Sequence, residues 1–152
     1  MQKTLILAAA LAVLGMVNAR TSTGACSAPA LQADFDAIKY QGTWFQAAKD
    51  KFSPDENGNC AQTRFIVNSD GTLNLRNSQF DNATQTISNA TLQNTCVGAR
   101  CSLGLSFLPW WAARGDYRVM ETDYLNYALI YSCKNAFLRN TKRDLAWIVT
   151  RE

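Results

Sequence analysis

The chain has 152 residues, a formal net charge of +3 and no histidine. Without histidine it has no Ser-His-Asp or Cys-His nucleophile pair and lacks the commonest ligand of catalytic zinc, which disfavours ordinary hydrolases and metalloenzymes. Its 15 basic and 12 acidic residues form no Lys/Arg cluster, which disfavours nucleic acid binding. We therefore expect no metal, no cofactor and no nucleic acid partner.

The first nineteen residues have the pattern of an export signal. Lys3 supplies a basic start, Leu5 to Val17 form an apolar run, and Val17-Asn18-Ala19 is a small-x-small cleavage site. The apolar run is too short to span a bilayer, which needs about 20 residues. We expect residues 1–19 to be removed and residues 20–152 to fold as one secreted domain.

From Gly42 onward, apolar and polar residues alternate with the period of two that half-buried strands require. No stretch has the pattern of a long amphipathic helix. The short links favour an all-β fold, an eight-stranded antiparallel up-and-down β-barrel, with a β-sandwich as the alternative. The predicted strands are 42–50, 60–67, 72–79, 85–92, 101–107, 116–122, 127–133 and 145–151.

The same alternation predicts the inner face of the barrel, if Phe65, Leu75, Phe107 and Trp147 point inward. Most strands then contribute large apolar residues, whereas the fourth contributes only Ser88 and Ala90. This asymmetry predicts unfilled volume on one side, with a packed core as the alternative. The predicted inner set is Phe65, Val67, Leu73, Leu75, Asn77, Ser88, Ala90, Leu103, Leu105, Phe107, Tyr117, Val119, Leu129, Tyr131 and Trp147.

Five cysteines lie in the exported part, so disulfides are expected and one cysteine is left over. Cys96 and Cys101 flank the link between the fourth and fifth strands, which favours a local bridge. Cys60 opens the second strand at the opposite end of the barrel, about 25 Å away and too far for a bridge to either. The pairing of Cys26 and Cys133 stays open at this point.

Two sequons predict glycosylation at Asn82 and Asn89, with unmodified polar positions as the alternative.

Phe52 and the pair Trp110-Trp111 fall in links at one barrel end. We expect them to rim the mouth and contact a membrane surface, because indoles suit such interfaces. A lid folded onto the pocket is the alternative.

Three short motifs occur in a fixed order, Gly42-Thr43-Trp44, Thr122-Asp123-Tyr124 and Trp147-Ile148-Val149-Thr150-Arg151. In this order, and with the predicted β-strands between them, these motifs resemble the three signature regions of the lipocalins. The wider runs Tyr40-x-Gly42-x-Trp44-Phe45 and Thr122 to Cys133 are most similar to the apolipoprotein D and bacterial lipocalin branch.

This resemblance implies several structural roles. Trp44 would plug the closed end with Arg151 packed over it, Asp123 would hold a turn, and Cys26–Cys133 would tie the N-terminal segment to the barrel. Lipocalins usually continue after the arginine with a helix on the barrel wall. This chain stops at Glu152, so we expect a truncated form, with a minimal barrel as the alternative.

The resemblance also implies a cup for a small hydrophobic molecule, a lipid, sterol, retinoid or pigment. Phe65, Asn77, Tyr117 and Trp147 match ligand-contacting positions, and we add Phe107 from the inner set. The expectation is a secreted, monomeric carrier without enzymatic activity.

Two alternatives stay open. One is a thiol-dependent isomerase using Cys60, which resembles the prostaglandin D synthase branch; its outward parity and the lack of histidine weigh against it. The other is an adhesion module that uses the mouth loops.

Overall fold

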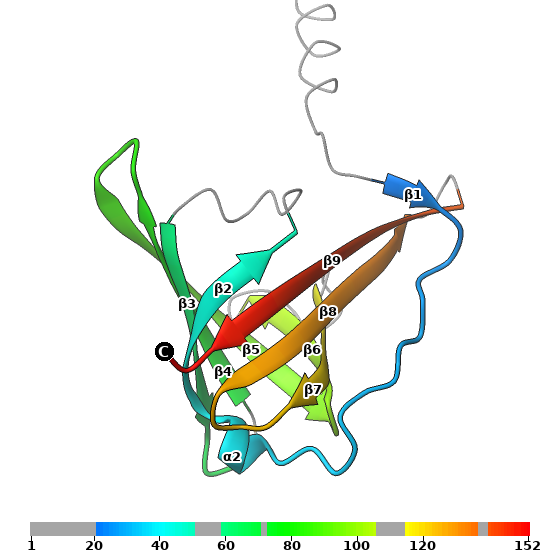
Figure 1. The fold of residues 1–152 in the computed structure, drawn as a ribbon, viewed down its shortest axis with the longest axis horizontal. Helices are drawn as coiled ribbons and strands as arrows, with labels where there is room; N and C mark the ends of the chain where they lie inside the picture. Colours follow the sequence, from blue (N-terminus) through cyan, green and yellow to red (C-terminus); the bar gives the residue numbers. More distant parts are fainter. Residues whose placement is uncertain (1–20, 51–58, 71–72, 106–114, 137–139) are drawn as a thin grey trace, which may run out of the picture.

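A computed structural model describes residues 21–50, 59–70, 73–105, 115–136 and 140–152 of the chain. Eight antiparallel strands form a closed barrel, as the alternation predicted. Each pairs with the next along the chain, and β9 pairs with both β8 and β2 to close the wall (Figure 1). The barrel strands are β2 (Gly42–Lys49), β3 (Asn59–Val67), β4 (Leu73–Asp81), β5 (Thr86–Val97), β6 (Arg100–Leu105), β7 (Gly115–Thr122), β8 (Tyr127–Ala136) and β9 (Thr141–Thr150).

Two short elements precede the barrel. β1 (Thr21–Thr23) pairs with the part of β9 that lies beyond the end of β2. α2 (Ala37–Tyr40) lies at the closed end, and its N-cap is Asp36, whose carboxylate accepts from the amides of Ile38 and Lys39. Among the described residues no helix is long and apolar enough to cross a membrane.

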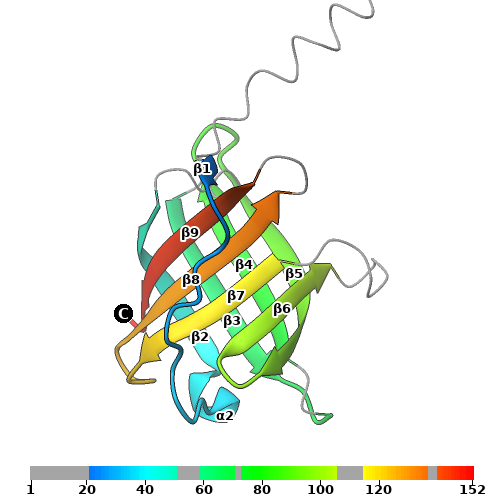
Figure 2. The same cartoon turned by 90° about the vertical axis from the view of Figure 1, so that its right-hand side faces the viewer.

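The segment between β1 and α2 crosses the outside of β8 and β7 (Figure 2). The disulfide Cys26–Cys133 fastens it to β8, as the family resemblance implied. Further along, the Gln32 amide donates to the Val119 carbonyl on β7. The second predicted bridge, Cys96–Cys101, joins register partners in the β5–β6 hairpin, and Cys60 is free and exposed.

An aromatic core fills the closed end. Trp44 is fully buried and its indole donates to the Tyr40 carbonyl over 2.8 Å. Its ring stacks on Tyr40 with centroids 5.0 Å apart, and Phe65 meets Tyr40 edge-on at the same distance. Because these rings interlock, the barrel is solid at this end.

Arg151 covers this core from outside, as the family resemblance implied. Its guanidinium carbon lies 3.7 Å from the Trp44 ring centroid, and its nitrogens donate to the carbonyls of Thr43 and Tyr124, among others. Gly42 has a φ of +106°, and a Cβ there would lie 2.8 Å from Nη1 of Arg151. Glycine is therefore needed both for the backbone conformation and for the close approach.

Asp123 holds the turn between β7 and β8. Its Oδ1 accepts from the amides of Leu125, Asn126 and Tyr127. The Asn126 amide foremost, then the Asn126 side chain and the Tyr127 amide, lower the pKa of Asp123 to about 2. The carboxylate is thus ionised at neutral pH and serves the turn, as predicted.

The predicted inner face is wrong on β8. Ala128 and Ile130 are buried inside the barrel, whereas Leu129 and Tyr131 point outward. The outward side of this strand is covered by the N-terminal segment, where Arg118 lies over the Tyr131 ring and donates to the Ser27 carbonyl. An aromatic residue such as Tyr131 can therefore be covered on the outer face of the barrel as well as in its interior. Side-chain polarity alone does not show which alternate residues of β8 face inward.

Asn94 is an unpartnered polar group in the barrel interior. It is 2% exposed, its register neighbours are Leu73 and Leu103, and within the described residues neither side-chain polar atom has a hydrogen-bond partner. We expect Asn94→Leu to raise the free energy of unfolding by about 1–3 kcal/mol in urea titrations, because the unpaired amide is removed. Asn94→Ala is the control, since it removes the amide without filling its volume. A destabilised Asn94→Leu would instead indicate a bound water that bridges the amide.

Candidate ligand-binding site

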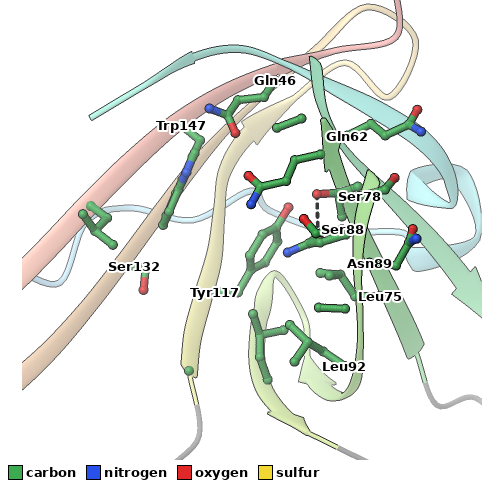
Figure 3. A pocket seen from close by; sticks show the side chains of 18 of the residues that line it. Gln46, Gln62, Leu75, Ser78, Ser88, Asn89, Leu92, Tyr117, Ser132 and Trp147 are labelled. Carbon is green, nitrogen blue, oxygen red and sulfur yellow. Dashed lines mark hydrogen bonds between the residues drawn. The ribbon is translucent and has the colours of Figure 1, made fainter. Parts of the chain in front are cut away.

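A cavity of about 670 Å³ lies within the barrel, and all eight barrel strands contribute to its lining. Leu75 and Leu92, from β4 and β5, and Trp147 from β9 give it apolar walls (Figure 3). Ser88 and Ala90, the small residues behind the predicted unfilled volume, line it too. Volume and lining match those of pockets for small apolar molecules.

Three of the five predicted ligand contacts line this cavity, namely Asn77, Tyr117 and Trp147. Phe65 does not line it. It is 3% exposed and packs beneath it, with its ring centroid 5.6 Å from that of Tyr117. Phe107 lies outside the described residues.

Thr63 and Asn77 form a polar pair on the cavity wall. The Thr63 hydroxyl donates to Oδ1 of Asn77 over 2.8 Å, which leaves the Asn77 amide hydrogens as donors. Their strands are adjacent, and the two residues are register partners. Asn77 is therefore held in a fixed orientation by its neighbour.

Tyr117 is less available than the sequence indicated. Its hydroxyl lies 2.9 Å from that of Tyr40, in the closed-end core. Burial above all, and then the charge and hydrogen bond of Tyr40, raise the pKa of Tyr117 well above its usual 10.0. Both phenols are therefore neutral at physiological pH. Each has a single O–H group, so whichever phenol donates to the other cannot also donate to a ligand.

Polar lining residues that we did not predict include Gln46, Gln62 and Thr63. Gln46 lies two residues from Trp44, and Thr63 lies two residues from Phe65, so each shares the inner face of its strand with a buried aromatic residue. Strict alternation would therefore have identified both. Gln62 has the opposite parity. The register between β3 and β4 shifts between Asn59 and Gln62, and this irregularity is not visible in the sequence.

Asp116 also lines the cavity, but its charge is already paired. Arg118 Nε lies 2.7 Å from Oδ2 and Arg100 Nε lies 3.3 Å from Oδ1, while the Cys133 amide donates to Oδ2. Among the described residues no three metal-ligating side chains gather. The lining therefore offers apolar contact and a few hydrogen bonds.

The remaining predicted positions do not line the centre of the cavity, or they lie outside the residues that the structure describes. Cys60 is exposed and does not line the cavity. Asn82, in the β4–β5 turn, and Asn89, on β5, are exposed, although Asn89 also reaches the cavity edge. Phe52, Trp110 and Trp111 lie outside the described residues.

Comparison with known proteins gives consistent matches over this barrel. The sequence model of the Lipocalin / cytosolic fatty-acid binding protein family matches residues 41–152. Apolipoprotein D of Mus musculus is 31% identical over 129 residues, covering 84% of this chain and 67% of the relative. Apolipoprotein D of Oryctolagus cuniculus is 33% identical over 131 residues, with the same two shares.

A solved structure has the same fold. Insecticyanin from the tobacco hornworm Manduca sexta superposes with a TM-score of 0.74 at 19% identity, covering 87% of this chain and 71% of that one.

Proposed function

This chain belongs to the lipocalin / cytosolic fatty-acid binding protein family, on the apolipoprotein D branch, and from this we propose that it is a secreted, monomeric carrier of a small hydrophobic ligand. The observation that carries the proposal is the cavity of about 670 Å³ above a solid aromatic floor. A closed lower end and apolar walls suit a molecule that enters with its apolar end first.

The Asn77 amide supports binding of a ligand with a polar acceptor. Its oxygen is occupied by Thr63, so its hydrogens are offered to the cavity. A carbonyl or hydroxyl oxygen on the ligand would satisfy them. Trp147 supplies a flat apolar face on the opposite part of the lining.

Carriage without chemistry is the simplest account of the lining. The sequence holds no histidine, and the free thiol of Cys60 is exposed outside the cavity. A thiol-dependent isomerase would need its nucleophile beside the bound substrate. Contact of Trp110 and Trp111 with a membrane stays a separate prediction.

Secretion is supported by the export pattern of residues 1–19 and by two disulfides, which persist in oxidising compartments. Glycan attachment at Asn82 and Asn89 fits their exposure. Native mass spectrometry of protein from its own host tests all of these together, because it weighs the processed chain, the glycans and any ligand that co-purifies.

Trp147 provides the direct test of binding in the cavity. We expect retinoids, fatty acids or steroids to quench or shift tryptophan fluorescence saturably, and Trp147→Ala to remove much of that signal and weaken binding about tenfold. Ile148→Ala is the matched control, because Ile148 is the next residue on β9 and is 44% exposed. Asn77→Leu should weaken steroid ketones more than fatty acids, because a buried acceptor loses its donor. If no ligand in the panel gives a saturable change with folded protein, the carrier proposal is wrong and adhesion becomes the better account.

A further inference from the structure

Two arginines lie directly opposite each other on the outer wall of the barrel. Arg64 on β3 and Arg76 on β4 are register partners in the antiparallel ladder. Both are exposed, whereas their strand neighbours Phe65 and Leu75 are buried in the core. Because successive side chains of a strand point to opposite faces, the two arginines point away from the cavity. They are not neighbours in the sequence, so only the pairing of β3 with β4 brings them together.

This arginine pair carries two positive charges without compensation. Within the part of the chain that the structure describes, neither Arg64 nor Arg76 takes part in an ion pair. The strands β2 to β5 form one continuous side of the wall (Figure 1), and their only acidic residue is Asp81. It ends β4, about 17 Å along the strand from Arg76, and its carboxylate accepts from the amides of Ala83 and Thr84. Like charges that face each other across two strands destabilise a sheet, and a bound anion would relieve this repulsion.

The geometry of the pair suits a tetrahedral anion. Side chains directly opposite each other on antiparallel strands have Cβ atoms about 5 Å apart. Each guanidinium is planar and presents parallel N–H groups along its edge. Two guanidiniums can therefore approach one sulfate or phosphate group from two sides, each donating two hydrogen bonds to a pair of its oxygens. A carboxylate has only two oxygens and matches a single guanidinium edge.

Hydroxyl groups extend the same row on both sides. Thr43 on β2 is the register partner of Arg64, and Thr91 on β5 is the register partner of Arg76. A threonine hydroxyl can donate to an anion and adds no charge that would repel it. The row of four residues thus presents donors to an anion across four adjacent strands.

Apolar surface lies beside this row. Phe45, two residues along β2 from Thr43, is 41% exposed, and Ile66, two residues along β3 from Arg64, is 42% exposed. Residues two apart in a strand share a face, so both side chains lie on the outer wall with the arginines. An organic group that carries the anion would find apolar contact there, which an inorganic ion cannot use.

We propose that Arg64 and Arg76 form an external binding site for a sulfate or phosphate monoester. The site lies outside the cavity and does not depend on the carrier function. The exposed Phe45 and Ile66 favour an ester whose organic part is apolar, such as an aryl ester. A second copy related by a two-fold axis does not suit this face, because it would bring the same two arginines against themselves.

The test titrates three small probes into the full folded protein at low salt. The probes are the N-acetyl amides of tyrosine O-sulfate, tyrosine O-phosphate and tyrosine, and the NMR signals of the arginine Nε–H groups report binding. We expect Kd values of about 1 mM for an ester and at least about tenfold weaker binding of the tyrosine probe. Binding of both esters or of one supports the site and identifies which ester it takes. Added salt should weaken this binding, because the site is exposed.

Arg64→Gln and Arg76→Gln should each weaken ester binding about tenfold, because a charged pair of hydrogen bonds is lost. Arg64→Lys should recover only part of the affinity, since an ammonium keeps the charge but not the parallel N–H groups. Arg100→Gln is the matched control, because Arg100 is exposed on β6 and its Nε lies 3.3 Å from Asp116. Its ester affinity should stay within about twofold of the original. Arg64→Gln should not lower the thermal midpoint of the free protein, because it removes a like-charge contact.

Three outcomes would overturn the site. In the first, neither ester binds more tightly than the tyrosine probe. In the second, Arg100→Gln weakens ester binding as much as Arg64→Gln, which would show a general charge effect. In the third, Arg64→Lys binds with full affinity, which would show that paired guanidinium edges are not needed. Ligand titrations followed by Trp147 fluorescence should be the same in the Arg64→Gln Arg76→Gln double variant, so failure of this site leaves the carrier function standing.

Discussion

Trp44→Ala is expected to lower the free energy of unfolding by about 3–5 kcal/mol, the cost of removing a large aromatic side chain from a core. Trp44 is fully buried, stacks on Tyr40 and carries the guanidinium of Arg151 on its outer face. Its removal opens a cavity and also leaves Arg151 without its stacking surface. Urea unfolding followed by far-ultraviolet circular dichroism measures the loss without depending on tryptophan fluorescence.

The matched control for Trp44 is Phe45→Ala. Phe45 is the adjacent residue on β2, faces outward and is 41% exposed. Its replacement should cost less than about 1.5 kcal/mol, because little buried surface is lost. Equal losses in the two variants would mean that the aromatic core does not stabilise the closed end.

Replacing both Cys26 and Cys133 with alanine is expected to cost about 4–5 kcal/mol. The bridge joins residues 107 apart in sequence, and the entropy that a crosslink removes from the unfolded chain increases with the length of its loop. The same replacement at Cys96 and Cys101, only 5 apart, should cost about 2 kcal/mol by the same relation.

Thermal and urea unfolding of the two double variants, both in a Cys60→Ser background, measures this difference. The Cys60 replacement prevents the exposed thiol from exchanging with the remaining bridge. If the short bridge contributes as much as the long one, the length of the closed loop does not determine what each bridge contributes to stability.

Much of the barrel could be predicted because its strands alternate cleanly between an apolar and a polar side. β2, β3, β4, β6 and β7 begin and end within two residues of the predicted ranges. β5 extends to Val97, whereas the prediction ended at residue 92. Its continuation, Gln93 to Val97, pairs fully with β6 but has few apolar residues to mark it.

The far ends of β8 and β9 could not be predicted because they fell in a predicted link. The seventh predicted strand ended at residue 133, whereas the corresponding β8 reaches Ala136. The eighth predicted strand began at residue 145, whereas the corresponding β9 begins at Thr141. Residues Lys134 to Asp144 are largely polar and have the composition of a loop. Within this range, Lys134–Ala136 and Thr141–Asp144 belong to strands because the two segments pair with each other, and β1 adds a third strand beside Thr141–Arg143.

Only some of the predicted ligand contacts lie in the cavity lining, for a related reason. Asn77, Tyr117 and Trp147 lie in strands whose phase was correct, so alternation placed them in the lining. Phe65 has the correct phase as well but lies too near the closed end. Alternation gives the face of a residue and not its height in the barrel, which depends on the tilt and stagger of the strands.

The pairing of β9 with both β2 and β8 has a consequence for the order of folding. Phe45 and Thr150 are register partners although roughly a hundred residues separate them, so barrel closure requires one of the longest loop closures that the chain can make. The hairpins from β3 to β8 can form locally, but neither the cavity nor the cover over Trp44 exists until β9 joins both edges. Such non-local pairing is slow, and while it is pending the apolar inner faces of the unclosed sheet are open to other chains. During refolding, the last strand of the barrel therefore limits both the rate at which a binding-competent protein forms and the time in which it is prone to aggregate.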